Sequence, residues 1–311
     1  MKVIYHPDFE DLEGHFPDKE IIEHPSRFDG LGDALRGMVN EDDLIQAEIT
    51  EVALAALRDT HDSRYIEQVR EVCEGLKPGE NEFLDGLETY VGPRSFNIAK
   101  RAVGAAVQAA QYAERGINAF AVVRPPGHHA ARNQAGGYCI FNNIAVAATY
   151  LVEHESANRV LMLDIDVHEG NGTLDILQQA RFDETVRYLS LSQGGLFGQS
   201  LDTPDSHHSL IYLDEGCGDD EYVAQFDKAF NRAIDEFHPN LIAVSAGFDT
   251  SSIDAQEERL SVGLQLTRRS YDHVVKKLNH SNLPYFCVLE GGYRTESIIM
   301  GLESFITDNG A

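Results

Sequence analysis

Polar side chains that could bind a metal are concentrated in residues 159–173, with the sequence RVLMLDIDVHEGNGT. Asp164, Asp166 and His168 occupy alternate positions there. Alternate side chains of an extended strand leave on the same face, so these three would converge. Converging buried polar groups cost free energy unless a partner replaces their lost hydration, and a divalent cation accepts Asp oxygen and His nitrogen as ligands. The spacing indicates a metal site, with an Asp–His hydrogen bond at a strand end as the alternative.

A buried strand must position these residues. Residues 160–163 form an apolar run of strand length bounded by polar residues, which is typical of a strand buried in a parallel sheet. The turn Gly170-Asn171-Gly172 follows, and its glycines indicate close approach of the backbone to another group. This favours the metal-site interpretation.

Similar apolar runs alternate with amphipathic helices along the chain. We predict further strands at residues 2–5, 119–123, 186–191, 241–245 and 285–289, and helices near residues 27–39, 50–57, 62–74, 93–115, 142–154, 219–237 and 264–279. Asp62 is the predicted N-cap of one helix, and Pro93 is placed in the first turn of another. Strands alternating with helices predict an α/β protein with a largely parallel sheet.

Polar residues also follow three of the other strands. His128 and His129 follow the strand at 119–123, Asp249 follows the strand at 241–245, and Tyr293 follows the last strand. Each has an ordinary explanation alone: a solvated histidine pair, an N-cap or a core tyrosine. Since sites in open parallel sheets form beyond the carboxyl ends of the strands, we expect them to join the Asp164–His168 group.

Composition limits the partners. The 311 residues include 25 Lys+Arg against 51 Asp+Glu, a net charge of −26, which disfavours nucleic acid and anionic membranes. Cationic partners such as polyamines or lysine-rich peptides suit this charge, and a solvated acidic surface without a partner is the alternative. The four cysteines form no CxxC pair and are expected to be free thiols in a reducing cytosol. Since no 18-residue apolar run occurs, we expect a cytoplasmic protein without a membrane span.

The chain resembles the zinc-dependent histone deacetylase and acetylpolyamine amidohydrolase family, nearest its class II-like members. The matching segments are RPPGHHA (124–130), GYCIFNN (137–143), LDIDVHEGNGT (163–173), SAGFD (245–249) and LEGGY (289–293), with weaker matches at HPSR (24–27) and THDSRYIE (60–67). The resemblance implies one deacetylase domain over residues 1–311. Its fold would be the three-layer arginase/deacetylase α/β fold, with a central eight-stranded parallel sheet flanked by helices.

The resemblance also implies the metal ligands. Asp166, His168 and Asp249 match zinc ligands, and three protein ligands leave an open position for water and a substrate carbonyl. Such sites also accept Fe²⁺ or Co²⁺. A structural K⁺ site is implied at a second group of residues, largely through backbone carbonyls: Asp164, Asp166, His168, Ser190 and Leu191.

Catalytic roles follow from the same matches. Asp164 matches the partner of His128, and Asn171 matches the partner of His129. A carboxylate partner raises a histidine pKa, whereas an amide carries no full charge, so His129 is assigned as the neutral general base and His128 as the more cationic histidine. Tyr293 matches the tyrosine that donates to the developing oxyanion.

Substrate contacts are the least regular part of the match. Gly137 and Tyr138 match the wall of the acetyl-lysine tunnel, where the family usually has Phe. Glu88 falls where class II-like members carry a rim Asp, and an exposed loop glutamate is the alternative. Phe197 is the candidate second aromatic wall, in a segment that departs from the family pattern.

These expectations define an amidohydrolase that removes an acetyl or similar short acyl group from an amine. Acetyl-lysine in protein and acetylated polyamine are both open as substrates, and a homo-oligomer is compatible with the sequence. A non-catalytic acyl-lysine binding protein is the alternative, which the retained Tyr293 and histidine pair disfavour. A binuclear manganese ureohydrolase is rejected because Gly170 stands two residues after His168, where that chemistry needs a bridging Asp.

Overall fold

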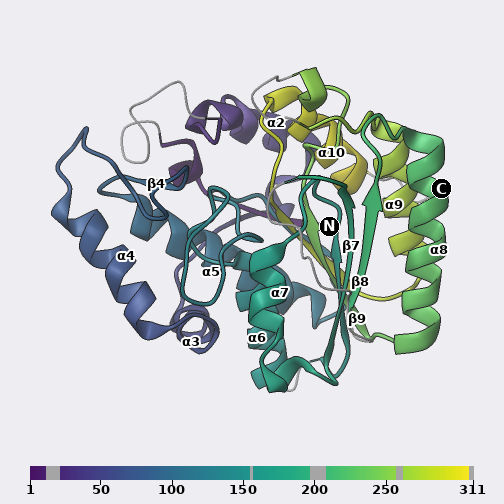
Figure 1. Cartoon of the computed structure of the whole chain (residues 1–311), viewed down its shortest axis with the longest axis horizontal. Helices are drawn as coiled ribbons and strands as arrows, with labels where there is room; N and C mark the ends of the chain where they lie inside the picture. The colour runs from purple at the N-terminus through teal and green to yellow at the C-terminus, as the bar shows by residue number, and fades with distance from the viewer. Residues whose placement is uncertain (12–21, 155–156, 197–207, 257–261, 308–311) are drawn as a thin grey trace.

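A single parallel sheet of eight strands forms the centre of the protein (Figure 1). The computed structural model describes residues 1–11, 22–154, 157–196, 208–256 and 262–307. The strands lie side by side in the order β2 (Leu44–Gln46), β1 (Lys2–Tyr5), β5 (Ala119–Ala121), β10 (Tyr285–Leu289), β9 (Leu241–Ala246), β6 (Val160–Asp164), β7 (Val186–Gln193) and β8 (His208–Leu213). Every pairing in this sheet is parallel, which confirms the predicted fold class.

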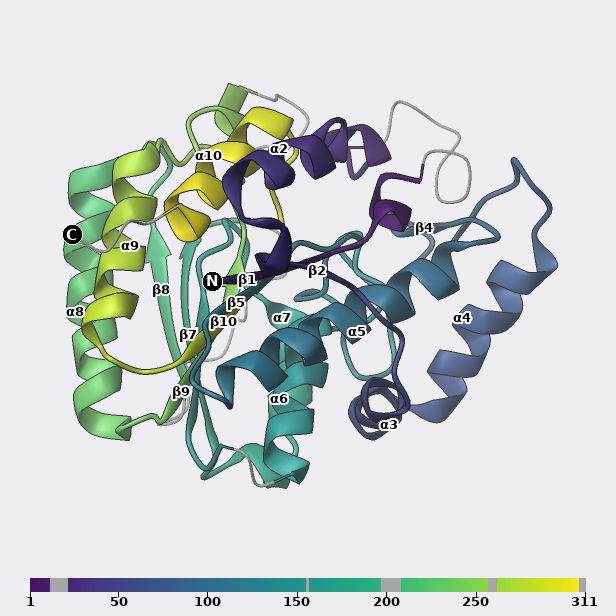
Figure 2. The ribbon, with the colours of Figure 1, turned by 180° about the vertical axis from the view of Figure 1, so that it is seen from behind.

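Helices cover both faces of the sheet (Figures 1 and 2). On one side α5 (Ser95–Ala113) packs against β1, β5 and β10, and α6 (Asn143–Glu153) packs on α5. On the other side α8 (Asp219–Phe237) packs against β7 and β8, and α9 (Arg268–His280) lies between α8 and α10 (Thr295–Ile306). The other α-helices among the described residues are α2 (Leu31–Met38), α3 (Glu51–Thr60), α4 (Ser63–Gly75) and α7 (Asn171–Leu177). A small antiparallel pair, β3 (Glu82–Phe83) and β4 (Tyr90–Val91), stands apart from the main sheet.

Burial explains which strands could be predicted. Every residue of β6, β9 and β10 is buried, because helices cover both faces there, and such strands are continuous apolar runs. The two edge strands, β2 and β8, were not predicted from the residues. β2 has no fully buried residue and β8 has only Leu213, so neither shows an apolar run. α10 was also missed.

Two local predictions need correction. Asp166 and His168 do not continue a strand, because β6 ends at Asp164. The carboxylate of Asp164 accepts a hydrogen bond from the Asp166 N–H at 3.1 Å, and that of Asp166 accepts one from the His168 N–H at 2.9 Å. Such side-chain turns curl the backbone away from an extended path, so a loop positions these side chains. Pro93 lies outside α5, whose N-cap is Arg94.

The predicted Asp62 cap and the predicted unpaired cysteines are confirmed. Asp62 caps α4 by accepting a hydrogen bond from the Arg64 N–H at 2.8 Å. All four cysteines are buried and unpaired. Among the described residues no helix is long and apolar enough to cross a membrane.

Candidate active site

Three potential metal ligands meet beyond the carboxyl ends of β6 and β9. Asp166, His168 and Asp249 each offer one ligand atom, and these atoms all lie within 4.8 Å of one another. Nδ1 of His168 is 3.3 Å from Oδ1 of Asp166 and 3.6 Å from Oδ2 of Asp249. In the part of the chain that the structure describes, this is the one such group of three His, Cys, Asp or Glu side chains.

The backbone holds both carboxylates from behind. The Gly291 N–H donates to Oδ2 of Asp166 at 2.8 Å, and the Val167 N–H donates to Oδ1 of Asp249 at 3.0 Å. A Cβ atom at Gly291 would collide with both carboxylates, and one at Gly247 would collide with Asp166. Within the described residues, the buried Oδ2 of Asp249 accepts no hydrogen bond. An uncompensated carboxylate oxygen facing an imidazole and a second carboxylate fits the donor set of a divalent cation.

The charges of this group also suit a cation. Burial raises the pKa of Asp249, and the charge of Asp166 raises it further. Burial tends to lower the pKa of His168, but the neighbouring negative carboxylates of Asp166 and Asp249 raise it to about 9. A metal ion would compete with this proton and relieve the repulsion between the two carboxylates.

The histidine pair lies beside this group, and each member has a different partner. Nδ1 of His128 is 3.1 Å from Oδ2 of Asp164, and Nδ1 of His129 is 2.6 Å from Oδ1 of Asn171. The two rings are 4.0 Å apart between centroids, and the His129 ring is 5.5 Å from that of His168.

The different partners separate the two pKa values. Burial lowers the pKa of His129 well below its ordinary value, and the charges of His128 and His168 lower it further. Burial acts on the pKa of His128 in the same direction, but the charges of Asp166 and Asp164 outweigh it and raise that pKa well above its ordinary value. These opposite directions favour a neutral His129 and a cationic His128. Since Oδ1 of Asn171 can only accept, a neutral His129 would carry its proton on Nδ1, and Nε2 would be the nitrogen that can take up a proton.

Glu290 positions this pair and was not assigned a role from the sequence. Its Oε2 accepts hydrogen bonds from the backbone N–H groups of Gly127 at 2.6 Å and His128 at 3.1 Å, and Ser245 Oγ lies 3.3 Å from Oε1. The sequence signal for this role was an acidic residue directly after the apolar run of β10. The structure shows that Glu290 has no exposure to solvent. Burial raises the pKa of Glu290 to about 7, and the charge of His128 opposes this rise.

Tyr293 and Tyr138 face each other near the metal ligands. Their ring centroids are 5.9 Å apart, and the guanidinium of Arg27 lies 4.8 Å from the Tyr293 ring. Burial and the charge of Asp249 raise the pKa of Tyr293 well above its ordinary value, which keeps its hydroxyl protonated. Gly137 and Tyr138 both have positive φ, of 52° and 66°. A Cβ at Gly137 would collide with the His129 ring, so the chain passes closely over that histidine.

Glu88 lies against this wall and is partly buried. Burial and the charge of Asp85 raise its pKa, while hydrogen bonds from the Gly137 N–H and the Tyr138 hydroxyl oppose the rise. Asp85 also fixes the turn, since its Oδ1 accepts from the backbone N–H of Glu88 at 3.0 Å and of Thr89 at 3.1 Å.

Three remaining candidate residues differ in their placement. Ser190 pairs in register with Asp164 on the neighbouring strand β6, and Leu191 follows it on β7; both are buried. Phe197 lies outside the described residues.

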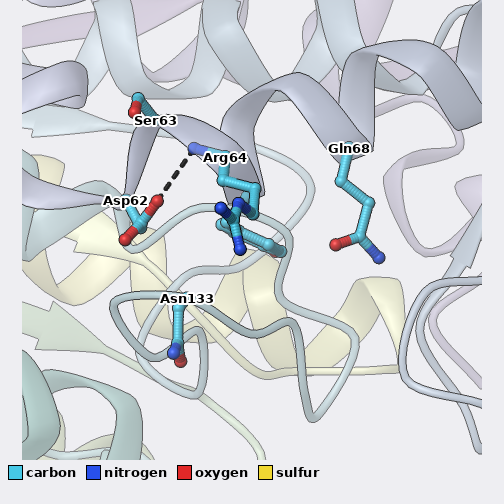
Figure 3. A pocket seen from close by; sticks show the side chains of 6 residues that line it. Asp62, Ser63, Arg64, Gln68 and Asn133 are labelled. Atoms are coloured by element: carbon cyan, nitrogen blue, oxygen red, sulfur yellow. Dashed lines mark hydrogen bonds between the residues drawn. The ribbon is translucent and has the colours of Figure 1, made fainter.

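A separate cavity lies at the N-terminus of α4 (Figure 3). It is lined by Asp62, Ser63, Arg64, Tyr65, Gln68 and Asn133. None of the candidate site residues lines it, so the chemistry above does not extend into it.

Comparisons with known proteins bear on the family and the fold of the chain. The family described as "Histone deacetylase domain" matches residues 21–308. The chain is 31% identical to human polyamine deacetylase HDAC10 over 315 residues, which cover 95% of this chain and 46% of that protein. It is 30% identical to a probable deacetylase of Methanothermobacter thermautotrophicus, covering 96% of this chain and 87% of the relative. The crystal structure of the HDA15 HD domain superposes with a TM-score of 0.84 at 26% identity, covering 98% of this chain and 90% of that one. The chain thus spans about half the length of the human relative.

Proposed function

This chain belongs to the histone deacetylase family, and from that premise we propose that it hydrolyses the amide bond between an acetyl, or similar short acyl, group and an amine. The observation that carries the proposal is that the ligand atoms of Asp166, His168 and Asp249 meet within 4.8 Å of one another, beside His129, whose pKa burial lowers well below its ordinary value. A metal group alone serves many purposes, but a metal group with an adjacent base and a phenol donor suits amide hydrolysis.

Asp166, His168 and Asp249 would hold Zn²⁺, with Fe²⁺ or Co²⁺ as acceptable substitutes. When bound, the cation supplies a Lewis acid for the amide carbonyl and acidifies a water molecule. Two carboxylate ligands neutralise much of its charge, so a protein base is needed as well. A structural K⁺ site at the carbonyls around Asp164 and Ser190 is a further part of the proposal.

His129 is the residue we assign to proton transfer. Its Nε2 accepts a proton from the attacking water and later delivers it to the nitrogen of the leaving amine as the C–N bond breaks. His128 stays cationic through Asp164 and stabilises the negative charge that develops. The Tyr293 hydroxyl donates a hydrogen bond to the oxyanion that forms from the carbonyl oxygen, and the products are a carboxylate and a free amine.

The substrate is an acetylated amine, and two classes compete. The human relative is named a polyamine deacetylase, and the family is named for histone substrates. Glu88 beside Tyr138 would attract a second positive charge on the substrate, and the net charge of −26 acts in the same direction at longer range. Both features suit an acetylpolyamine, and a lysine-rich peptide also carries the required charge.

A comparison of kcat/KM for acetylputrescine, acetylspermidine and an acetyl-lysine peptide on zinc-loaded protein tests the proposal. Hydrolysis of at least one substrate, with a loss of about 10²–10³ in kcat for Tyr293→Phe, is expected. Binding of all three without turnover would instead support a non-catalytic acyl-lysine binding protein. Glu88→Gln should lower kcat/KM for the cationic polyamines more than kcat/KM for a peptide without further charge. Equal effects on both would show that Glu88 takes no part in substrate recognition.

A further inference from the structure

Asp254 is a buried carboxylate whose hydrogen bonds lead directly to Tyr293. It begins the short 3-10 helix η5 (Asp254–Gln256) and has no exposure to solvent. Its Oδ2 accepts a hydrogen bond from the Tyr293 N–H at 2.6 Å, and its Oδ1 accepts one from the Arg294 N–H at 3.2 Å. The Ser297 hydroxyl lies 2.7 Å from the same Oδ1.

The backbone before Tyr293 would otherwise be free to turn. Gly291 and Gly292 precede it, and Gly292 has a φ of 116°, a conformation that only glycine adopts without strain. Asp254 therefore holds the first peptide N–H after a two-glycine hinge. The direction in which the Tyr293 side chain leaves the backbone depends on this contact.

The same carboxylate completes the start of α10. The N-cap residue of this helix is Arg294, whose side chain has no hydrogen-bond acceptor. Asp254 supplies an acceptor from another segment, and its negative charge lies at the positive end of the helix dipole. Burial raises the pKa of Asp254 to about 6, while the hydrogen bonds from Ser297 and Tyr293 oppose this rise, so the group is ionised at neutral pH.

Asp254 also belongs to the segment that carries Asp249. The Phe248 N–H donates to the Gly291 carbonyl at 3.0 Å, which joins the two segments before the hinge, and Asp254 joins them after it. The Asp254 N–H donates to Ser251 Oγ at 3.2 Å, which fixes Asp254 relative to Asp249. Hydrogen bonds at Gly291 and at Tyr293 therefore tie this stretch of backbone to the segment that carries the metal ligand Asp249.

We propose that Asp254 is a positioning residue that holds the Tyr293 hydroxyl where it donates to the oxyanion. The proposal rests on the proposed function, because it concerns the placement of that donor. Asp254 itself touches neither the ligand group nor the substrate position; it acts through the backbone of Tyr293.

The variant Asp254→Asn tests this. An amide keeps the shape but presents one oxygen and an NH₂ group to three donors, so at least one contact becomes unfavourable. Displacement of the hydroxyl should lower kcat by about 10- to 100-fold. Since ground-state binding does not use the oxyanion contact, KM should change less than about threefold. A rise in KM at unchanged kcat would overturn the proposal.

A double-mutant cycle separates positioning from general damage. If Asp254 acts through Tyr293, Asp254→Asn should cost less than about threefold in kcat in a Tyr293→Phe background. If the kcat loss of the double variant equals the product of the two single-variant losses, the proposal is overturned while the proposed function stays intact. Full activity of Tyr293→Phe alone would instead overturn the oxyanion role, and the positioning role with it.

A matched control and a second readout complete the test. Asp219 contacts the start of α9 much as Asp254 contacts that of α10: it accepts from the N–H of the N-cap residue Thr267 at 2.9 Å and from the Ser270 hydroxyl at 2.6 Å, far along the chain from the hinge. Asp219→Asn should lower the melting temperature as Asp254→Asn does but leave kcat unchanged. Amide exchange followed by mass spectrometry should speed up over residues 290–297 in Asp254→Asn, with or without metal. Unchanged exchange there, or an equal kcat loss in Asp219→Asn, would contradict the proposal.

Discussion

Nδ1 of His128 lies 3.1 Å from Oδ2 of the buried Asp164. The same carboxylate oxygen also accepts a hydrogen bond from the Tyr188 hydroxyl at 2.8 Å, so its position is fixed from two sides. The neighbouring His129 has an amide partner in Asn171 instead. His128 and His129 are adjacent in the sequence, yet one has a carboxylate partner and the other an amide partner, and these partners favour opposite charge states.

We predict that His129→Ala loses more activity than His128→Ala. A general base contributes about 10²–10⁴ to the rate, whereas a nearby positive charge contributes only through electrostatics. The measurement is kcat/KM on zinc-loaded protein for both variants. Equal or reversed losses would refute the division of labour between the two histidines.

Metal binding should stabilise the folded chain measurably. A ligand at about a hundredfold above its Kd adds about 2.7 kcal/mol to the free energy of unfolding. We expect added Zn²⁺ to do so in the wild type, and a chelator to reverse it. Asp249→Asn removes a ligand and should lose most of this increment together with bound zinc, whereas Asp219→Asn should keep both. A zinc increment that survives in Asp249→Asn would place the ion elsewhere.

Glu290 should tolerate one substitution and not another. In Glu290→Gln the amide oxygen can still accept from Gly127 and His128 while the NH₂ group faces Ser245 Oγ, so kcat should stay within about threefold. Glu290→Ala leaves two buried N–H groups unpaired, at about 1–3 kcal/mol each, and frees the histidine loop. Unfolding by urea and kcat for the two variants decide this. A larger loss in the glutamine variant would show that the negative charge itself is required.

His61 should make the fold sensitive to acid. It is buried, its Nε2 accepts from the Asn142 N–H at 2.9 Å, and burial lowers its pKa to about 4. The unfolded chain takes up this proton near pH 6.5, so between these values the unfolded state holds more protons. The contribution is present above pH 6.5 and is lost as pH falls through about 4, with about 2 kcal/mol lost by pH 5.

Denaturant unfolding at pH 7 and pH 5 measures this loss. His61→Gln should reduce the difference between the two free energies of unfolding by about 2 kcal/mol. His280→Gln, at an exposed histidine, is the control. An unchanged difference in His61→Gln would assign the acid sensitivity to other groups.

One physical reason explains why the central strands and the convergence of polar residues could be predicted from the sequence. Parallel strands buried on both faces are apolar runs, and their carboxyl ends share one edge, so Asp166, His168 and Asp249 could be brought together without coordinates. β2 and β8 lack that signal because each is an edge strand with an exposed side.

Other parts of the site depend on contacts that no local pattern encodes. The family resemblance alone indicated the partner of each histidine. His128 and His129 are adjacent in the sequence, so their separation from Asp164 or from Asn171 does not tell them apart. Glu290 and Asp254 accept hydrogen bonds from backbone N–H groups of distant segments, and every residue type except proline can offer such a donor. Their roles became visible only with the backbone in place.

Asp249 reaches across 82 residues to accept a hydrogen bond from the Val167 N–H, beside His168. Neither Asp166 with His168 nor Asp249 alone offers enough ligands to bind a metal ion tightly, so we expect a refolding chain to bind the proposed ion only when β6 and β9 have paired. Metal uptake would then report when these two distant segments pair, and we expect a nascent chain to bind the ion only after both ligand-bearing segments have been synthesised.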